Sequence, residues 1–223
     1  GWRIIGTTRS ADKAREIAAS GVEPLIWPDA DLEPLLGQIP NVLISIGPGT
    51  DGDPVLNAYT SIVARTAPEL RWVGYLSTTG VYGNHDGGWV DENTALTPTT
   101  KRGTARMQAE RRWQAIPALP LHIFRLAGIY GPGRGPFTKV KDGTARRIIK
   151  KDQVFSRIHV DDIAQALVLS LHQPTPDGIY NLCDDDPVPP QDVIAYAAAL
   201  LGVPVPPEIA IEDADMSPMA RSF

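Results

Sequence analysis

The chain has 223 residues, of which 43% are hydrophobic and 21% are charged, and its formal net charge is −5. This composition suits a globular protein, and the acidic balance argues against nucleic acid or an anionic membrane as a partner. No apolar run approaches the ~20 residues of a membrane span, and a single cysteine excludes an internal disulfide. We therefore expect a cytoplasmic protein that binds neither nucleic acid nor membrane; nothing in the sequence indicates an oligomer.

Hydrophobic strands alternate with helices along the chain. Ser10 is a suitable helix N-cap, and residues 84–98 are rich in Gly, Asp, Asn and Thr, which is typical of a long loop. The expected strands are residues 2–8, 23–27, 41–46, 71–77, 121–126 and 178–182. The expected helices are residues 11–20, 54–67, 99–113, 161–171 and 191–201. This alternation predicts an α/β fold with a doubly wound parallel sheet.

Three short motifs stand where expected strands end, which is where ligands collect in open α/β sheets. They are Ser77-Thr-Thr-Gly-Val-Tyr-Gly83, Arg125-Leu-Ala-Gly-Ile-Tyr-Gly-Pro-Gly-Arg134 and His159-Val-Asp-Asp-Ile-Ala164. The set resembles the extended branch of the short-chain dehydrogenase/reductase superfamily, the NAD(P)-dependent epimerase/dehydratase proteins, over nearly the whole chain. In that family a Tyr-x-x-x-Lys pair performs the proton chemistry, whereas the matching stretch here reads Arg102-Gly-Thr-Ala-Arg106. The resemblance therefore points to an atypical subgroup that lacks the pair.

The resemblance also implies how the chain is organised. It predicts a Rossmann-type dinucleotide-binding core at residues 1–128 and 155–183, and a smaller substrate-side region at residues 129–154 and 184–223. The glycine-rich phosphate turn of the family is not recognisable, because the nearest candidate, Ser45-Ile-Gly-Pro-Gly49, contains a proline and no helix follows it directly. The first residues look like the second strand of the dinucleotide fold. We therefore expect the first strand and the glycine-rich turn to lie upstream, in roughly 25 to 30 residues before Gly1.

The candidate cofactor residues favour NADP, with NAD as the alternative. At the end of the second strand of such folds, an acid bonds the ribose 2′-hydroxyl of NAD, whereas an arginine suits the 2′-phosphate of NADP. Arg9 stands at this position and Ser10 adds a hydroxyl, although Arg9 could also be an exposed loop residue. By resemblance Asp29 lies near the adenine, unless it only forms a turn, and Ser45 and Arg106 complete the candidate cofactor site.

Four residues take the places of the family's catalytic groups. Thr78 matches the Ser/Thr whose hydroxyl holds the substrate oxygen, and Tyr82 usually faces the same pocket; alternatively, Thr78 caps the next loop and Tyr82 packs beneath it. Arg102 and Arg106 replace Tyr and Lys on one helix. Arg106 can still bond a ribose or phosphate, but the guanidinium of Arg102 cannot shuttle protons. The two arginines could instead hold an anion, or belong to a solvated basic helix.

Other departures from the family narrow the expected chemistry. Thr79 and Gly80 replace the Asp-Glu pair of the sugar-nucleotide dehydratases, Phe155 replaces an arginine common in nucleotide-sugar enzymes, and Gly128 replaces an asparagine. These losses argue against 4,6-dehydration and against a sugar-nucleotide substrate. We expect an oxidoreductase or epimerase acting on a small polar substrate. The alternative is a non-catalytic protein that senses NADP(H) and regulates a partner.

The third motif and the lone cysteine suggest structural roles. Asp161 and Asp162 stand at the expected start of a helix, where carboxylates favour the helix dipole, and His159 directly precedes them. Cys183 follows a strand and is expected to pack there. The four histidines are scattered and offer no converging ligands, so we expect no metal site.

Overall fold

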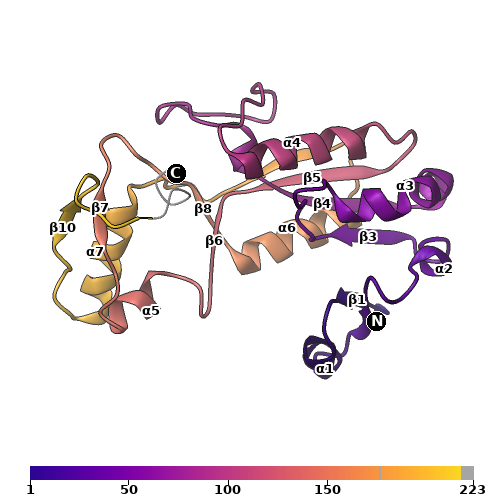
Figure 1. The fold of residues 1–223 in the computed structure, drawn as a ribbon, viewed down its shortest axis with the longest axis horizontal. Coiled ribbons are helices and arrows are strands. Elements are labelled where there is room, and N and C mark those ends of the chain that lie inside the picture. The colour runs from indigo at the N-terminus through magenta and orange to yellow at the C-terminus, as the bar shows by residue number, and fades with distance from the viewer. Residues whose placement is uncertain (176, 217–223) are drawn as a thin grey trace.

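A four-stranded parallel sheet forms the centre of the computed structural model, which describes residues 1–175 and 177–216. Its strand order is β3–β4–β5–β9 (Figure 1). In the register, Thr78 at the end of β4 lies opposite Leu126 at the end of β5. The strands are β3 (Asn41–Ile44), β4 (Trp72–Thr78), β5 (Leu121–Leu126) and β9 (Ile179–Leu182).

Helices cover both faces of this sheet (Figure 1). Successive strand residues point to opposite faces, so Val73 and Tyr75 of β4 pack in the core beneath α3 and α4, whereas Trp72 packs with Ile163 of α6. The expected doubly wound α/β sheet is thus confirmed. The covering elements are α3 (Pro54–Thr66), the 3-10 turn η1 (Ala67–Glu69) and α4 (Lys101–Gln114) on one face, and α6 (Val160–His172) on the other.

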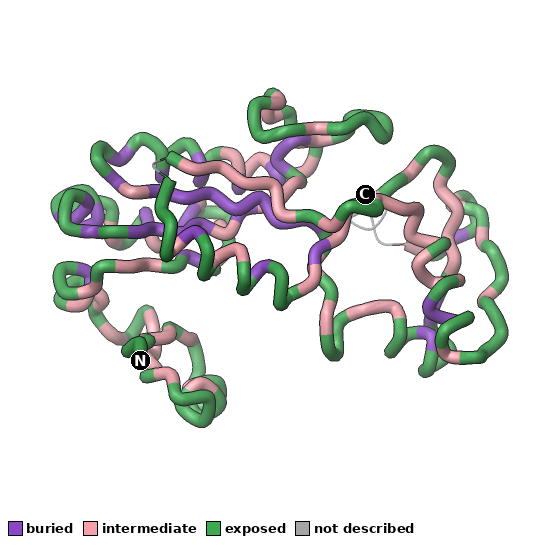
Figure 2. Tube along the Cα trace, turned by 180° about the vertical axis from the view of Figure 1, so that it is seen from behind, coloured by how far each residue is buried: buried purple, intermediate pink, exposed green. Residues whose placement is uncertain are grey.

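The first two strands form a separate parallel pair. β1 and β2 are hydrogen bonded to each other and, among the described residues, to no strand of the four-stranded sheet. Ser10 caps α1 as expected, its hydroxyl accepting from the backbone N of Lys13 at 3.3 Å. Figure 2 shows this unit to be mostly exposed or half-buried. Its elements are β1 (Ile5–Thr8), α1 (Ala11–Ala19), β2 (Glu23–Ile26) and α2 (Glu33–Leu36).

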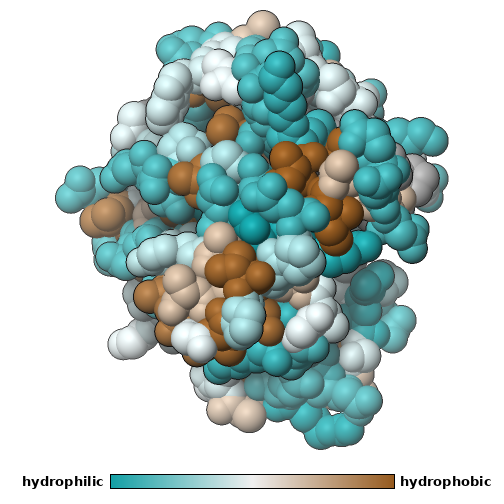
Figure 3. Space-filling view, turned by 90° about the vertical axis from the view of Figure 1, so that its left-hand side faces the viewer, coloured by the Kyte–Doolittle hydropathy of each residue, from teal (hydrophilic) through white to brown (hydrophobic). Residues whose placement is uncertain are grey.

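A smaller unit lies at the carboxyl side of the sheet, at the left of Figure 1. β7 pairs with β10 in parallel, and α5 packs on α7 around a small core that includes Val140 and Ala198. Phe137, Tyr196 and Leu200 are exposed on this unit, and Figure 3, which looks onto it, shows hydrophobic patches between hydrophilic ones. The elements are α5 (Pro136–Lys141), β7 (Arg147–Ile149), α7 (Pro190–Leu201) and β10 (Glu208–Ala210).

A third parallel pair joins the sheet to the smaller unit. β6 (Gly128–Tyr130) follows β5 directly and pairs with β8 (Arg157–His159), which precedes α6. The expected strands and helices agree with the observed ones to within about three residues at each end. The sequence reasoning missed the short elements, namely α2, α5, β6, β7, β8 and β10. Within the described residues, none of the helices combines the length and the apolar character needed to cross a bilayer.

Candidate functional site

Thr78 lies at the carboxyl end of β4, where the sheet meets the smaller unit. It begins the 3-10 turn η2 (Thr79–Val81), and its hydroxyl accepts a hydrogen bond from the backbone N of Gly80 at 3.2 Å. The side chain is half-buried. Thr78 therefore caps the next turn, as one of the two interpretations expected, and its hydroxyl proton stays available to a ligand oxygen.

Arg106 reaches back from α4 onto the same end of β4. Its side chain is only 9% exposed, and its Nη1 donates to the carbonyl oxygen of Leu76 and, at 3.4 Å, to the hydroxyl of Tyr75. The guanidinium carbon lies 5.7 Å from the centre of the Tyr75 ring, a cation–π distance. Burial raises the pKa of Tyr75 to about 12, and the charge of Arg106 acts in the opposite direction. A solvated arginine is therefore the wrong picture for Arg106.

Gly47, in the loop after β3, faces the guanidinium of Arg106. A Cβ atom added at Gly47 would lie 2.8 Å from Nη2 of Arg106, which is closer than side-chain carbons approach other atoms. The absence of a side chain at Gly47 thus makes room for the arginine. Arg102, four residues earlier on α4, is exposed and has no hydrogen-bond partner among the described residues. The structure thus buries Arg106 and leaves Arg102 in solvent.

Tyr82 lies under the loop that follows η2. It is 2% exposed, and its hydroxyl accepts from Nη1 of Arg125 at 2.8 Å and donates to Oδ1 of Asn181 at 2.8 Å. Both hydrogen bonds are made to protein groups, which favours the packing interpretation. The phenol is held rather than presented to the carboxyl edge.

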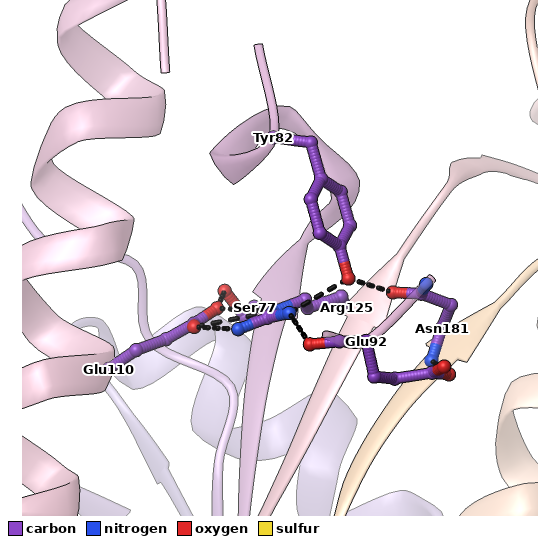
Figure 4. Close-up of polar contacts among 6 residues, drawn as sticks. All are labelled: Ser77, Tyr82, Glu92, Glu110, Arg125 and Asn181. Carbon is purple, nitrogen blue, oxygen red and sulfur yellow. Dashed lines mark hydrogen bonds and ion pairs between the residues drawn. The ribbon is translucent and has the colours of Figure 1, made fainter. Parts of the chain in front are cut away.

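The contacts of Tyr82 belong to a buried polar network that the sequence did not reveal (Figure 4). Arg125 of β5 forms an ion pair with Glu110 of α4, 2.8 Å between Nη2 and Oε2, and Ser77 donates to the same carboxylate. Burial by itself would lower the pKa of Arg125, but its hydrogen bonds to Glu110 and Tyr82 and the charge of Glu110 raise it overall. A signal existed, since Arg125 is the one charged residue in the apolar strand Leu121–Leu126.

The same network fixes the long loop, residues 84–98, at its base. The carboxylate of Glu92 accepts from the backbone N of Asn181 at 2.7 Å, and the carbonyl of Glu92 accepts from Arg125 at 3.3 Å. Thr97 donates to the carbonyl of Tyr82 at 2.7 Å. The tip of the loop, residues 86–90, faces solvent, since Trp89 is 83% exposed.

The remaining candidate cofactor residues fall into two groups. Arg9, Ser10 and Asp29 are exposed near the carboxyl ends of β1 and β2, whereas Ser45 is exposed just after β3. Arg9 has no ion-pair partner among the described residues and could meet a phosphate. Ser10 is already engaged as the cap of α1. No glycine-rich turn for a pyrophosphate joins β1 to α1, since that connection is Arg9-Ser10.

The third motif has the structural role that the sequence indicated. His159 caps α6, its Nδ1 accepting from the backbone N of Asp161 at 3.2 Å, and two acidic residues occupy the first helical turn. Cys183 is exposed, so the expectation that it packs beside the strand is wrong. Desolvation and the neighbouring carboxylates of Asp184 and Asp185 raise the pKa of its thiol, which disfavours a reactive thiolate.

No protein-family model matches the sequence. Protein YeeZ of Escherichia coli (strain K12) is 28% identical in an alignment of 221 residues that covers 92% of this chain and 78% of YeeZ. A solved structure from Silicibacter pomeroyi DSS, of a functionally unknown conserved protein, is 61% identical, with a TM-score of 0.96 over 100% of this chain and 78% of that one.

Two structures in complex with NAD share the fold at low sequence identity. The dTDP-glucose 4,6-dehydratase of Bacillus anthracis str. Ames is 18% identical, with a TM-score of 0.73 over 95% of this chain and 77% of that one. The UDP-glucuronic acid 4-epimerase of Bacillus cereus is 17% identical, with a TM-score of 0.72 over 94% and 79%. The fold is therefore that of the NAD-dependent epimerases and dehydratases. The chain itself belongs to the same family as the Silicibacter pomeroyi protein.

Proposed function

We propose that this protein is an NADP(H)-dependent oxidoreductase or epimerase of the extended short-chain dehydrogenase/reductase type, from a subgroup without Tyr-x-x-x-Lys, acting on a small polar substrate. The observation that carries the proposal is the hydroxyl of Thr78 at the carboxyl end of β4, on the strand whose Leu76 carbonyl accepts from the buried guanidinium of Arg106. In open α/β folds this edge is where ligands bind. The two structural neighbours in complex with NAD support a nicotinamide cofactor.

Each residue has a defined part in the proposed reaction. The nicotinamide, when bound, supplies or accepts hydride at a substrate carbon. Thr78 holds the oxygen on that carbon by a hydrogen bond, and Arg106 adds positive charge that stabilises an oxyanion. Because a guanidinium keeps its proton at neutral pH, the proton moves between the substrate oxygen and water rather than through Arg106. In this proposal Tyr82 positions the site instead of reacting.

The cofactor would be held by residues near the ends of β1 and β2 and by a residue just after β3. Arg9 would pair with the 2′-phosphate, which is the reason for preferring NADP over NAD. Ser10 would contribute its position at the start of α1, where the helix dipole favours an anion, and Asp29 would lie near the adenine. Ser45 would meet the cofactor from the loop after β3, in which Gly47 faces Arg106.

A second candidate function is a sensor that binds NADP(H) without catalysis. It is favoured by the exposed Arg102, because its guanidinium, which cannot shuttle protons, stands where the family has its tyrosine. The experiment that separates the two measures NADPH binding by fluorescence titration and NADPH oxidation against a panel of small carbonyl compounds. Turnover that is lost in Thr78→Val supports the enzyme. NADPH binding with no turnover on any carbonyl supports the sensor, and no binding of NADPH or NADH contradicts both.

A further inference from the structure

One face of the β6–β8 pair carries polar side chains at the junction between the sheet and the smaller unit. The register places Gly128 opposite Arg157 and Tyr130 opposite His159. Because side chains alternate along a strand, these four residues share one face, while Ile158 is buried on the other face, in the core that includes Ile163 of α6. Gly128 comes two residues after Leu126, the partner of Thr78, so the face begins about 7 Å along the chain from that pair.

Arg157 is a half-buried cation on this face that forms no ion pair with any of the described residues. Its Nη1 donates to two backbone carbonyls, those of Phe155 at 2.9 Å and Val188 at 3.3 Å. Among the described residues its Nε and Nη2 have no hydrogen-bond partner. The nearby carboxylate of Asp184 accepts from the backbone N of Arg157, at 3.4 Å, instead of from the guanidinium. Burial lowers the pKa of Arg157, and the charges of Asp184 and Tyr130 offset part of this effect.

Tyr130 and His159 supply two further donors beside the arginine. Their rings lie 5.1 Å apart at 70°, and Tyr130 is 36% exposed. Since Nδ1 of His159 accepts from the backbone of Asp161, the neutral ring carries its proton on Nε2. A Cβ atom added at Gly131 would lie 2.6 Å from Cγ1 of Val160 and 3.6 Å from this Nε2, so the glycine lets the chain pass close to both side chains.

We propose that Arg157, Tyr130 and His159 form a subsite for an oxyanion, a carboxylate or a phosphate, carried by the substrate. A partly desolvated cation with two unused donor nitrogens binds an oxyanion strongly, because the anion supplies both a counter-charge and hydrogen-bond acceptors. The proposal deepens the proposed function and rests on it in one respect: the substrate would place its reacting carbon at Thr78 and its anionic group here. It predicts a substrate that is small and negatively charged.

The test is an NMR titration of the four histidines of the whole protein with inorganic phosphate, and separately with malonate. We expect the ring signals of His159, assigned with His159→Asn, to shift in a saturable way while those of the buried His122 stay still. The anion that binds more tightly, phosphate or malonate, shows whether the substrate carries a phosphate or a carboxylate. No saturable shift with either anion overturns the proposal.

Arg157→Met should weaken anion binding about ten- to hundred-fold, the scale of charge-assisted hydrogen bonds. Arg147→Met is the matched control, because Arg147 is a half-buried arginine that is paired with Glu208. If both variants lose anion affinity equally, the anion is attracted by positive charge in general and not by a subsite, and the proposal is overturned. If Arg157→Met does not fold, Tyr130→Phe replaces it, with a several-fold weakening expected and unchanged binding contradicting the proposal. NADPH titration of the same samples tests the proposed function separately, since anion binding at His159 does not require the cofactor.

Discussion

Glu110 and Arg125 form an ion pair that is closed to solvent, their side chains being 0% and 3% exposed. The pair joins α4, which carries Arg106, to β5, the strand beside Thr78. Through Ser77 and Tyr82 it also holds both sides of the turn that begins at Thr78. The candidate site is therefore built around a charged core that does not itself face a ligand.

Breaking this ion pair should strongly destabilise the fold. Glu110→Gln leaves the guanidinium of Arg125 buried without a counter-charge, and we expect the free energy of unfolding to fall by about 3 to 5 kcal/mol. Urea denaturation measures the change. The double variant Glu110→Gln with Arg125→Met should recover part of the loss, because it removes the unpaired charge. A loss below about 1 kcal/mol in the single variant would show that the pair is not desolvated.

Tyr82→Phe should loosen the long loop with little effect elsewhere. The change removes one hydroxyl that bridges Arg125 and Asn181, at a cost of about 1 to 2 kcal/mol. Hydrogen exchange of the amides in residues 84–98 should become faster. Tyr180→Phe is the matched control, since it removes a hydroxyl that lies 3.5 Å from His122 on the same sheet. Equal exchange in both variants would contradict a specific role for Tyr82.

Arg106→Ala and Arg102→Ala should differ although they lie on one helix. Arg106→Ala removes buried hydrogen bonds, so both NADPH affinity and the free energy of unfolding should fall, the latter by about 1 to 3 kcal/mol. Arg102→Ala changes an exposed residue, and both quantities should stay within about 0.5 kcal/mol of the parent. Fluorescence titration and thermal unfolding check the pair. The expectation fails if the two variants behave alike.

Arg9→Asp should weaken NADPH binding and reverse the cofactor preference. We expect a loss of about 1.5 to 3 kcal/mol for NADPH, the range for hydrogen bonds to charged groups, and little loss for NADH. Competitive titration with both cofactors measures this difference. Arg71→Asp, which makes the same charge change at an exposed residue just before β4, should leave both affinities unchanged. Equal affinities for NADPH and NADH in the parent protein would refute the assignment of Arg9.

Acidification should destabilise the protein through His122. Burial lowers the pKa of this imidazole from 6.5, and its Nε2 has no partner among the described residues. The unfolded chain therefore takes up the proton more readily, so stability falls as the pH drops below about 6.5, by at most ~1.4 kcal/mol per pH unit. Urea denaturation at several pH values should show this slope in the parent and in His85→Gln. His122→Phe should reduce it, and an unchanged slope would contradict the prediction.

The sequence predicted the sheet well because its strands are continuous apolar runs. It predicted α4 as a helix but not which face is buried. The buried positions of α4 follow helical spacing, yet they hold a glycine, an arginine and a glutamate besides Ala109 and Trp113. Hydrophobic periodicity is hidden in such a helix, so the difference between Arg102 and Arg106 could not be foreseen. The partner of Glu110 lies on another element, and only the packing of α4 on the sheet brings the two together.

The long loop, residues 84–98, is anchored at its base. Tyr82, Glu92 and Thr97 hold the base through contacts in which residues 86–90 take no part. Mutations at the tip therefore leave the buried charges and the core unchanged. The tip, which includes the exposed Trp89, can therefore change its side chains without loss of folding, so that the surface of this loop and the stability of the protein can evolve independently.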